Sequence, residues 1–370
     1  MIVDTSPAIR AEAERLFAYF QSAGAQPVET DILQPAETLL DLYGEDIRAR
    51  AYVTSDPLRG EQMLRPDFTV PVVRMHMADG ALPARYTYMG KVFRKQEHHQ
   101  GRPTEYFQVG YEVFDPADPA AADAEVFARF SDVLAPLGLR AATGDIGILL
   151  AAVDGLTTTE RRKAALRRHL WRPRRFRALL ERYGGRSPMP ESRARLLHKV
   201  GKDGLNAVID QAGPEIGMRS RAEVAARVSA LIEDAATPPI ATGEVEILEH
   251  IMGLRETCPN VLERLRDIAV DLPQISAAVT RMERRLDALS ARGTDVGALE
   301  FEASFGRTSM EYYDGFVFGF FAEGRSDLPP VATGGRYDAL TRILGQGRTI
   351  PAVGGVVRPG VVLSVTGGGA

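Results

Sequence analysis

The sequence predicts an α+β fold in which an antiparallel sheet is flanked by helices and the chain carries a helical insertion. The first observation is a pair of β-rich runs, residues 84–94 and 105–114, on either side of a polar loop, which is typical of an antiparallel hairpin. The second is a purely helical pattern over about 151–298, after which β-type patterns return. We therefore predict a core formed by residues 1–150 and 299–370 and a helical insertion formed by residues 151–298.

The overall composition limits the class of protein. With 370 residues, 45% hydrophobic and 25% charged, the chain has the content of a globular protein with a large core and more than one domain. A net charge of -4 gives no global indication of nucleic-acid binding. The single Cys258 cannot form an internal disulfide, which is typical of the reducing cytosol. No run approaches the roughly 18 apolar residues of a membrane span, and the N-terminus lacks the features of a signal peptide, so we expect a cytoplasmic protein.

The N-terminal segment predicts a helix over residues 8–23. Ser6 is placed to cap it, Pro7 lies in its first turn, and Gly24 follows its end. The apolar residues at helical spacing are Ile9, Ala13, Leu16, Phe17 and Phe20. Residues 52–54 are then expected to form a short strand that leads toward the hairpin.

The second run of the hairpin separates into two faces, because side chains two positions apart share one face of a strand. The apolar face suits a core and consists of Phe107, Val109, Tyr111 and Val113. The opposite face consists of Tyr106, Gln108, Gly110, Glu112 and Phe114. Gly110 lies between two polar side chains, so this face either forms a floor that a ligand approaches closely or meets water, as many antiparallel sheets do.

Further elements follow the hairpin. Residues 121–134 have the spacing of a helix packed on the sheet, and residues 144–149 have the pattern of a short buried strand. The clearest helical segments of the insertion are Val224–Leu231, Val245–Leu254 and Ile275–Leu289. Residues 299–303 and the aromatic run within 311–321 predict further strands.

Residues 161–186 form a basic block that is opposed, within the block, only by Glu181. Such a block binds RNA, binds an acidic partner subunit, or forms a solvated helical face, and the sequence leaves these three interpretations open. Few aromatic residues lie between the arginines, so stacking on single-stranded bases is not indicated.

Three motifs of the hairpin region occur in a fixed order. They are Arg-Pro-Asp-Phe-Thr at residues 65–69, Gly-Lys-Val-Phe-Arg at 90–94 and Gln-Val-Gly-Tyr-Glu at 108–112. Together they resemble the histidyl-tRNA synthetases, which are class II aminoacyl-tRNA synthetases, and the last two resemble the second signature motif of that class. The resemblance implies the antiparallel sheet of a class II synthetase-like core.

Weaker likenesses lie elsewhere in the predicted core. Residues 29–40 resemble the first class II motif, a helix-strand pair used for dimerisation. Residues 311–315, 334–338 and 351–354 resemble the family's Asp-Tyr-Tyr-x-Gly, Gly-Gly-Arg-Tyr-Asp and Pro-Ala-x-Gly segments. The likeness covers about 1–150 and 299–357 and is thin between them.

The resemblance implies a site for the backbone groups of histidine. Asp67 matches a glutamate that holds the substrate α-ammonium, and Thr69 and Gln108 match residues that hold the ammonium and the neighbouring carboxylate. An ammonium needs a carboxylate and neutral acceptors, so these residue types suit the task. Arg94 matches an arginine that contacts the α-phosphate of ATP, and here it is expected to contact a phosphate or a carboxylate.

The resemblance also implies a site for the imidazole ring. Glu112 and Tyr313 match the residues that bind the imidazole, and Tyr337 matches a tyrosine lining the same cavity. An imidazole requires an acceptor for one N–H and a partner for its other nitrogen, which a carboxylate and a phenol supply.

Two positions depart from the family pattern. Thr308 stands where the family has a catalytic arginine, and Arg307 is one residue away, on the other side of a strand. Val361 stands at the arginine of the third class II motif, and Arg358 substitutes for it only if the backbone follows a different path. Amino-acid activation passes charge onto a pyrophosphate leaving group, and each positioned cation stabilises that charge by roughly 3 kcal/mol. Because two such arginines are missing from their positions, we expect no aminoacylation and no catalytic residue. The given chain ends soon afterwards, so we expect no anticodon-binding domain.

A chain with a synthetase-like histidine site but without activation chemistry resembles the regulatory subunits of the short-form ATP phosphoribosyltransferases. These enzymes catalyse the first step of histidine biosynthesis. This likeness implies a non-catalytic chain that binds histidine for feedback and activates a separate short catalytic subunit, as a self-dimer within a hetero-oligomer. No acidic pair followed by Thr-Gly of the phosphoribosyl pyrophosphate type is found. Two alternatives stay open: a histidyl-tRNA synthetase or aminoacylating paralogue, supported by Arg94, and an RNA-binding paralogue that uses the basic block.

Other reactive residues give no site. His98 and His99 lie in the hairpin loop without a third ligand nearby, so no metal site is expected. Cys258 has no activating base in the sequence and is expected to be an idle thiol. The resemblance implies no cofactor.

Overall fold

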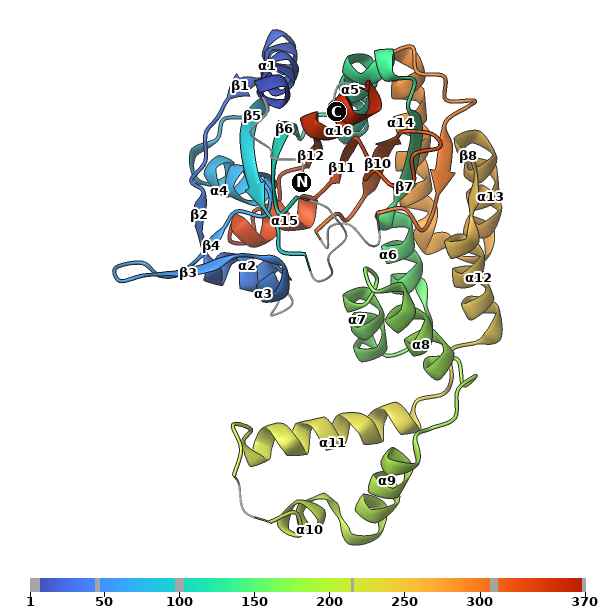
Figure 1. The fold of residues 1–370 in the computed structure, drawn as a ribbon. Coiled ribbons are helices and arrows are strands. Elements are labelled where there is room, and N and C mark those ends of the chain that lie inside the picture. Colours follow the sequence, from blue (N-terminus) through green and yellow to red (C-terminus); the bar gives the residue numbers. More distant parts are fainter. Residues whose placement is uncertain (1–6, 44–46, 97–102, 214–215, 307–311, 368–370) are drawn as a thin grey trace. The chain divides into compact units, whose positions relative to one another are not determined.

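A computed structural model describes residues 7–43, 47–96, 103–213, 216–306 and 312–367. The helices and strands are labelled in Figure 1, and the chain divides into two compact units. Unit 1 comprises Met1–Leu150 and Met252–Ala370, and unit 2 comprises Ala151–Ile251. Each unit is described by itself below.

Unit 1 is built on a nine-stranded sheet with the strand order β1-β5-β6-β12-β11-β10-β7-β9-β8. The strands in this order are β1 (Gln26–Pro27), β5 (Ala84–Phe93), β6 (Glu105–Phe114), β12 (Ala352–Val357), β11 (Ala332–Arg336), β10 (Phe316–Phe321), β7 (Arg140–Asp145), β9 (Glu300–Glu302) and β8 (Arg255–Thr257). Neighbouring strands are antiparallel except in the pairs β1–β5 and β7–β9. Strands from both ends of the sequence therefore meet at β6 and β12.

The predicted hairpin is confirmed as β5 and β6. Its register places Gly90 opposite Gln108, Tyr88 opposite Gly110 and Tyr86 opposite Glu112. Because paired residues share a face of the sheet, these side chains all lie on the face that the sequence analysis identified as polar.

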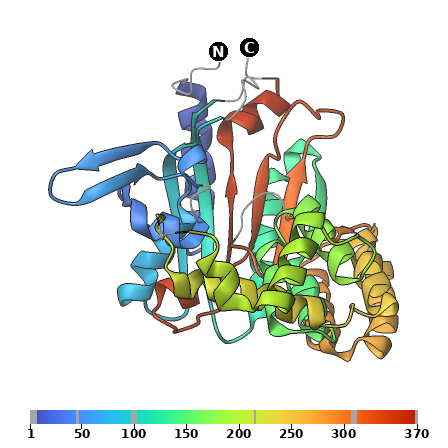
Figure 2. The same cartoon turned by 90° about the horizontal axis from the view of Figure 1, so that it is seen from below.

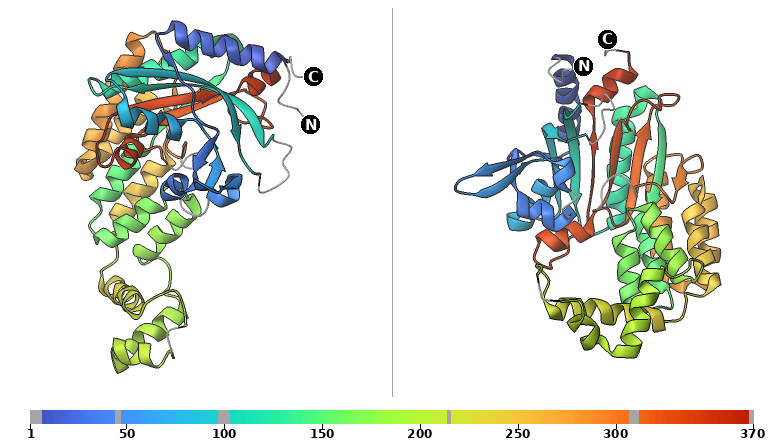
Figure 3. Two further views of the ribbon diagram at one scale, coloured as in Figure 1. Left: turned by 90° about the vertical axis from the view of Figure 1, so that its left-hand side faces the viewer. Right: turned by 60° about the horizontal axis from the view of Figure 1, so that its bottom comes forward.

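Helices α1 (Pro7–Ser22) and α5 (Pro119–Leu134) cover the apolar face of the sheet (Figure 3). The Phe20 ring of α1 stacks on Tyr111 with ring centroids 5.2 Å apart. On α5, Phe127 and Phe130 contact the ring of Phe318 in β10 at 5.6 and 5.5 Å. These contacts confirm the two predicted helices and the apolar face of β6 as the core.

The remaining helices of unit 1 lie around this core. They are α2 (Ala36–Tyr43), α3 (Ile47–Arg50), α4 (Thr69–Asp79), α6 (Ile146–Gly155), which crosses into unit 2, α13 (Cys258–Asp271), α14 (Ser276–Ala291), α15 (Asp338–Leu344) and α16 (Pro359–Val365). Short 3-10 turns occur at Ala135–Leu137 and Pro273–Ile275. Helix α4 brings Thr69 to the polar face of the sheet, opposite to α1. Among the described residues, no helix has both the length and the apolar character needed to cross a membrane.

A smaller sheet with the order β2-β4-β3 precedes α4. It consists of β2 (Leu33–Pro35), β3 (Val53–Asp56) and β4 (Gly60–Leu64), so the strand expected at residues 52–54 is present as β3. The β3–β4 hairpin extends away from the large sheet (Figure 2), and Leu58 at its turn is 95% exposed. The segment that resembles the first class II motif forms β2 followed by α2.

The prediction of a single strand over residues 144–149 is wrong. Strand β7 ends at Asp145, and helix α6 begins at Ile146. The Asp145 carboxylate accepts a hydrogen bond from the Gly147 amide at 2.9 Å and so satisfies one of the free N–H groups at the helix start. A short apolar run is buried in either conformation, so its composition did not distinguish a strand from a buried helix.

Unit 2 is helical and begins at residue 151, the predicted start of the insertion, within α6. Its other helices are α7 (Glu160–Arg168), α8 (Pro173–Tyr183), α9 (Glu191–Asp203), α10 (Leu205–Asp210), α11 (Arg221–Ala236) and α12 (Thr242–Gly253), whose last residues belong to unit 1. The unit ends at residue 251, whereas the predicted insertion extends to 298. Helices α13 and α14 belong to unit 1, where Arg285 of α14 is paired with Asp123 of α5.

The basic block lies on α7 and α8, and carboxylates of unit 2 neutralise much of it. The ion pairs are Arg161–Glu233, Arg162–Asp234, Lys163–Glu160, Arg167–Asp154, Arg167–Glu160 and Arg186–Glu249. Arg174, Arg175 and Arg177 are exposed on α8, whose other face buries Phe176 and Leu180. For Arg174, Arg175 and Arg177 this pattern is typical of a solvated helical face, one of the three interpretations of the block. Arg162 differs from them because it is buried.

Candidate functional site

A buried carboxylate, Glu112 of β6, is the centre of the predicted histidine site. Its Oε1 accepts hydrogen bonds from the Tyr88 hydroxyl at 2.7 Å and the Thr69 hydroxyl at 3.0 Å. Its Oε2 accepts one from the Tyr337 hydroxyl at 2.6 Å. The donors come from β5, from the first residue of α4 and from the residue after β11, so three separate segments converge on one side chain.

Glycines make room for this cluster. Gly354 of β12 is paired with Glu112, and a Cβ atom at Gly354 would lie 1.5 Å from Glu112 Oε2. A Cβ atom at Gly110 would lie 2.1 Å from the Tyr88 ring. A floor for a ligand at Gly110 was one of the two interpretations of this face; in the structure the ring of Tyr88 covers Gly110, and its hydroxyl donates to Glu112.

The donors to Glu112 are neutral, and this sets its electrostatics. Burial raises the pKa of Glu112 to about 7, with the three hydroxyl donors acting in the opposite direction and the nearby Asp67 charge raising it further. A carboxylate offers about four acceptor positions, and hydroxyls occupy three of them. One position stays available for another donor, such as the N–H of an imidazole.

Asp67 lies beside this cluster, at the start of α4. It is 3% exposed, and its Oδ1 accepts a hydrogen bond from the Val70 amide at 3.3 Å. Its charge also acts to raise the pKa values of Glu112 and Tyr313, which places the three groups in one electrostatic environment. Thr69 was expected to contact a ligand ammonium; its hydroxyl proton is directed to Glu112, so only its oxygen lone pairs are left for a ligand.

Gln108 is fully buried on the same face as Glu112, and among the described residues neither its amide oxygen nor its amide nitrogen has a hydrogen-bond partner. A buried polar group without a partner costs about 1–3 kcal/mol, so its position needs an explanation. The alternative that this face simply meets water does not apply to the described residues, because Gln108 and Glu112 are both 0% exposed.

Two tyrosines complete the predicted set. Tyr313 is 6% exposed, and burial, followed by the charges of Glu112 and Asp67, raises its pKa. Its ring packs edge to face against the Tyr312 ring with centroids 4.9 Å apart, and the centroids of the Tyr312 and Tyr337 rings are 6.1 Å apart. All six predicted histidine-binding residues are therefore buried in the region around Glu112. The Tyr337 hydroxyl donates to the Glu112 carboxylate.

Arginines border this cluster. Arg94 donates from Nε to the Pro66 carbonyl at 2.8 Å. Arg358 donates to the Pro330 carbonyl at 2.8 Å and to Thr333 Oγ1 at 3.1 Å. Burial lowers the pKa of Arg358; the phenols of Tyr106 and Tyr313 act to raise it, and the charge of Arg94 lowers it. Strand β12 ends at Val357 and α16 begins at Pro359, so Arg358 lies in the connection between them.

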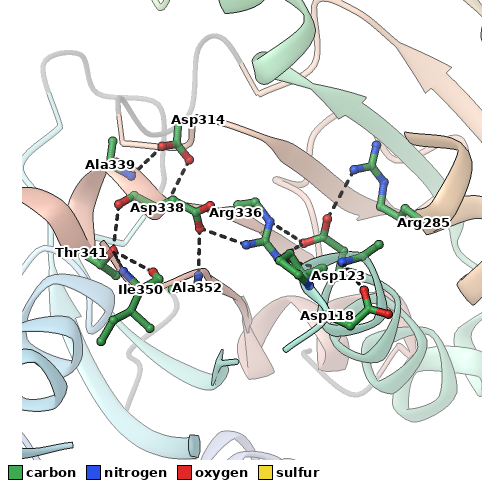
Figure 4. A network of polar contacts seen from close by, with 12 residues as sticks. Asp118, Asp123, Arg285, Asp314, Arg336, Asp338, Ala339, Thr341, Ile350 and Ala352 are labelled. Atoms are coloured by element: carbon green, nitrogen blue, oxygen red, sulfur yellow. Dashed lines mark hydrogen bonds and ion pairs between the residues drawn. The ribbon is translucent and has the colours of Figure 1, made fainter. Parts of the chain in front are cut away.

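An ionic network binds Arg336 and Asp338, the two sequence neighbours of Tyr337 (Figure 4). Arg336 donates to Asp123 Oδ1 from Nε and Nη2 at 3.0 and 2.8 Å and to Asp338 Oδ1 at 3.0 Å. Asp338 also accepts the Ala352 amide at 2.9 Å, and Asp123 is further paired with Arg285 at 3.4 Å. The two neighbours of Tyr337 are thus fixed to α5, α14 and β12.

Sequence reasoning missed several of these residues. Tyr88 was not assigned to the site, although its place opposite Gly110 was a usable signal, since a glycine across a strand pair leaves space for a ring. Asp123 and Arg285 carried no local signal, because their partners are distant in the sequence.

Thr308, Arg307, His98 and His99 lie outside the described residues. Within the described residues, no group of three or more His, Cys, Asp or Glu side chains is arranged to hold a metal ion. Cys258 is buried, and burial raises the pKa of its thiol.

Comparison with known proteins gives one consistent result. The family described as histidyl-tRNA synthetase matches residues 4–237 and 218–360. A protein named ATP phosphoribosyltransferase regulatory subunit from Brucella anthropi is 32% identical over 349 residues, which covers 89% of this chain and 90% of that protein. A protein of the same name from Brucella canis is 30% identical over 344 residues, with coverage of 89% and 90%.

Solved structures share the fold. One described as an ATP phosphoribosyltransferase regulatory subunit/histidyl-tRNA synthetase from Bacillus halodurans has a TM-score of 0.67 at 21% identity and covers 97% of this chain and 79% of that chain. A histidine–tRNA ligase subunit from Alicyclobacillus acidocaldarius has a TM-score of 0.60 at 22% identity, with coverage of 98% and 94%. These similarities confirm the predicted α+β, class II synthetase-like fold.

Proposed function

The chain belongs to the family of ATP phosphoribosyltransferase regulatory subunits, which share the histidyl-tRNA synthetase fold, and on this premise we propose that it binds histidine at Glu112 and thereby regulates a separate catalytic subunit. The observation that carries the proposal is the buried carboxylate with one acceptor position left beside an unpartnered amide at Gln108. Histidine supplies an N–H for the carboxylate and a carboxylate for the amide nitrogen.

In the proposed complex, the imidazole N–H is donated to Glu112 and the ring packs against Tyr313. Asp67 accepts from the α-ammonium, together with the oxygen lone pairs of Thr69. Gln108 and Arg94 face the carboxylate end. Tyr337 and Tyr88 contact Glu112 rather than the ligand, and so fix the direction of its free lone pair.

The regulatory part of the proposal requires two states of the chain with different affinities for histidine. The catalytic partner is a short ATP phosphoribosyltransferase chain, which this chain activates and which histidine inhibits through it. By reciprocity, the state of the partner changes the histidine affinity by the same factor, typically about 5- to 150-fold.

The test is an inhibition curve. The chain is combined with a short catalytic chain, assembly is checked by size-exclusion chromatography with light scattering, and transferase activity is measured against histidine concentration. Tyr313→Ala is expected to leave the complex assembled and active and to move the curve to higher histidine. Tyr19→Ala, which alters a tyrosine of α1 on the other face of the sheet, is the matched control. An unchanged curve for an intact Tyr313→Ala complex places the feedback site elsewhere.

We further propose that the chain works in the cytoplasm as a hetero-oligomer that contains a dimer of this chain, with β2 and α2 in the dimer contact. The support is the resemblance of these residues to the first class II motif. Light scattering of the chain alone tests the dimer, since a monomer at micromolar concentration contradicts it.

A second candidate is residual histidine activation. The position of Arg358 near Tyr313 and within the influence of Arg94 favours it, because two cations can stabilise charge on a phosphate. We nevertheless propose that no aminoacylation occurs, since Val361 occupies the family's arginine position and Arg358 is committed to the Pro330 carbonyl and Thr333. Histidine-dependent exchange of pyrophosphate into ATP at the rate of a true synthetase contradicts this.

A further inference from the structure

Unit 2 contains a cavity of about 220 Å³ with guanidinium groups in its lining. Arg162 of α7, Arg182 of α8 and Arg193 of α9 contribute to the wall, and Asp234 of α11 is the carboxylate among the described lining residues. The cavity belongs to unit 2 alone and is separate from the Glu112 cluster of unit 1.

The charges around this cavity do not balance. Asp234 accepts from Arg162 Nε at Oδ1 and from Arg193 Nη2 at Oδ2, both at 2.6 Å, so each oxygen of this carboxylate is already paired. Arg182 forms no ion pair with any described residue; its guanidinium lies 4.6 Å from the centre of the Tyr183 ring. Three cations therefore share one carboxylate, which leaves two positive charges on the wall.

Arg193 supplies a second, independent observation. Its Nε is buried and has no hydrogen-bond acceptor among the described residues. A buried N–H of a charged group without an acceptor is unfavourable, and such groups are usually satisfied by water or by an ion. Arg162, in contrast, is fully engaged, because it also donates to the carbonyls of Pro238 and Asp234, both at 2.7 Å. Arg193 and Arg182 are thus the residues with donors to offer.

We propose that this cavity binds a phosphate group. Guanidinium forks match the oxygens of phosphate in geometry, and a phosphate monoester carries about -1.5 to -2 charges at neutral pH, which offsets the two surplus positive charges. A single carboxylate would offset only one. The cavity is smaller than the roughly 300–1,000 Å³ typical of sites that enclose a whole organic ligand. The structure therefore favours a small phosphate, or the terminal phosphate of a molecule whose remainder stays outside.

The pKa of Asp234 agrees with this arrangement. Burial alone would raise it, but the hydrogen bonds from Arg162 and Arg193 lower it below the ordinary value, so the carboxylate stays ionised and holds both arginines at the wall. The proposal does not depend on histidine regulation.

The test uses the full-length chain without histidine or partner. Isothermal titration and thermal unfolding are carried out with inorganic phosphate, with chloride adjusted to keep the ionic strength constant. Wild type is expected to bind phosphate and to unfold at a higher temperature in its presence. Arg182→Gln and Arg193→Gln are each expected to weaken phosphate binding at least tenfold. Circular dichroism and the unfolding temperature without phosphate check that each variant is folded.

The matched control is Arg177→Gln, since Arg177 is an exposed arginine of the same helix outside the cavity lining. It is expected to bind phosphate as wild type does. Ribose 5-phosphate and ATP, each compared with ribose and adenosine, identify the source of the phosphate group; tighter binding of either phosphorylated compound supports the proposal and names that source. Equal stabilisation by phosphate and chloride, or wild-type binding by a folded Arg182→Gln variant, overturns it.

Discussion

Two buried carboxylates of unit 1, Glu112 and Asp123, lie on opposite sides of the same sheet and differ in their hydrogen-bond donors. Asp123 on α5 meets the guanidinium groups of Arg336 and Arg285. Glu112 on β6 meets only hydroxyl groups. Both are buried below 4% exposure, so the difference lies in the donors and not in the depth.

The donors determine what each carboxylate does. Asp123 has charged donors on both oxygens, and this closes a network that joins α5, α14 and β11. Burial raises the pKa of both carboxyl groups, but two guanidinium groups act to lower that of Asp123, whereas only neutral hydroxyl donors act to lower that of Glu112. Neutral donors compensate a charge less completely than cations do. The ionic cluster around Asp123 therefore stabilises the fold. The cluster around Glu112 can be stabilised further by a ligand that donates a hydrogen bond to the carboxylate.

The largest effect is expected on the ionic side. Arg336→Ala leaves Asp123 buried with only the 3.4 Å contact to Arg285, and breaking a buried pair in this way costs about 3–5 kcal/mol. The free energy of unfolding is measured with urea. Arg325→Ala is the control, because Arg325 pairs with Asp327 at the surface, and it is expected to change little. A stable Arg336→Ala variant would show that the network is not a fold determinant.

The pH dependence of stability sharpens the comparison from the Glu112 side. The folded state binds a proton at Glu112 more tightly than the unfolded state, since burial raises the pKa from an ordinary value of 4.5 to about 7. The contribution of this group is therefore fully present below about pH 4.5 and is lost as the pH rises through 7, by up to about 3 kcal/mol.

This dependence is measured by urea unfolding between pH 5 and pH 8 for wild type and Glu112→Gln, without histidine. The wild type is expected to lose stability relative to the variant as the pH rises. Parallel curves for the two proteins would mean that folding does not raise the pKa of Glu112, and the comparison would fail.

Ligand binding gives the next effect. Glu112→Gln replaces the acceptor for the imidazole N–H by a neutral amide, and a hydrogen bond to a charged group contributes about 1.5–3 kcal/mol, so histidine affinity is expected to fall about 10- to 100-fold. Isothermal titration measures it. Glu105→Gln, on the same strand but paired with Lys91 near the surface, serves as the control. Wild-type affinity of a folded Glu112→Gln protein would remove this residue from the site.

The smallest effect tests a single neutral donor. Tyr88→Phe removes one hydroxyl from Glu112 while its ring still fills the space over Gly110, and we expect histidine affinity to fall by about tenfold or less with little loss of stability. Tyr86→Phe is the matched control on the same strand, because the Tyr86 hydroxyl meets His76 at 3.1 Å instead. A loss of affinity from Tyr86→Phe equal to that from Tyr88→Phe would mean that the donor to Glu112 has no special role.

The sequence predicted what depends on local alternation. The faces of β6 follow from a period of two, so the buried side of Tyr111 and the polar side of Gln108 and Glu112 could be assigned before the structure was known. The convergence of Asp67, Tyr313 and Tyr337 on Glu112 came from the family resemblance, since no local pattern links residues so distant in the chain.

What could not be predicted depends on tertiary partners. The run at 144–149 is apolar in either a strand or a helix, and Asp145 decides between them by capping α6. Helices α13 and α14 have the same pattern as those of unit 2, and only tertiary contacts show that they pack on the core: Arg285 of α14 pairs with Asp123 and Asp145, and Cys258 of α13 contacts Thr143 of β7. In the same way, nothing in the basic block marks Arg162 as the buried arginine among exposed ones.

The alternation at the end of β11 also limits how this protein can evolve. Arg336 enters the ionic network on one face, and its neighbour Tyr337 donates to Glu112 on the other. Insertion or loss of a single residue within β11 would exchange the two environments and put a guanidinium where the phenol belongs. Changes of length within the family are therefore expected to collect in the connection between β10 and β11, at residues 322–331, while the distance from Gly334 to Asp338 stays constant.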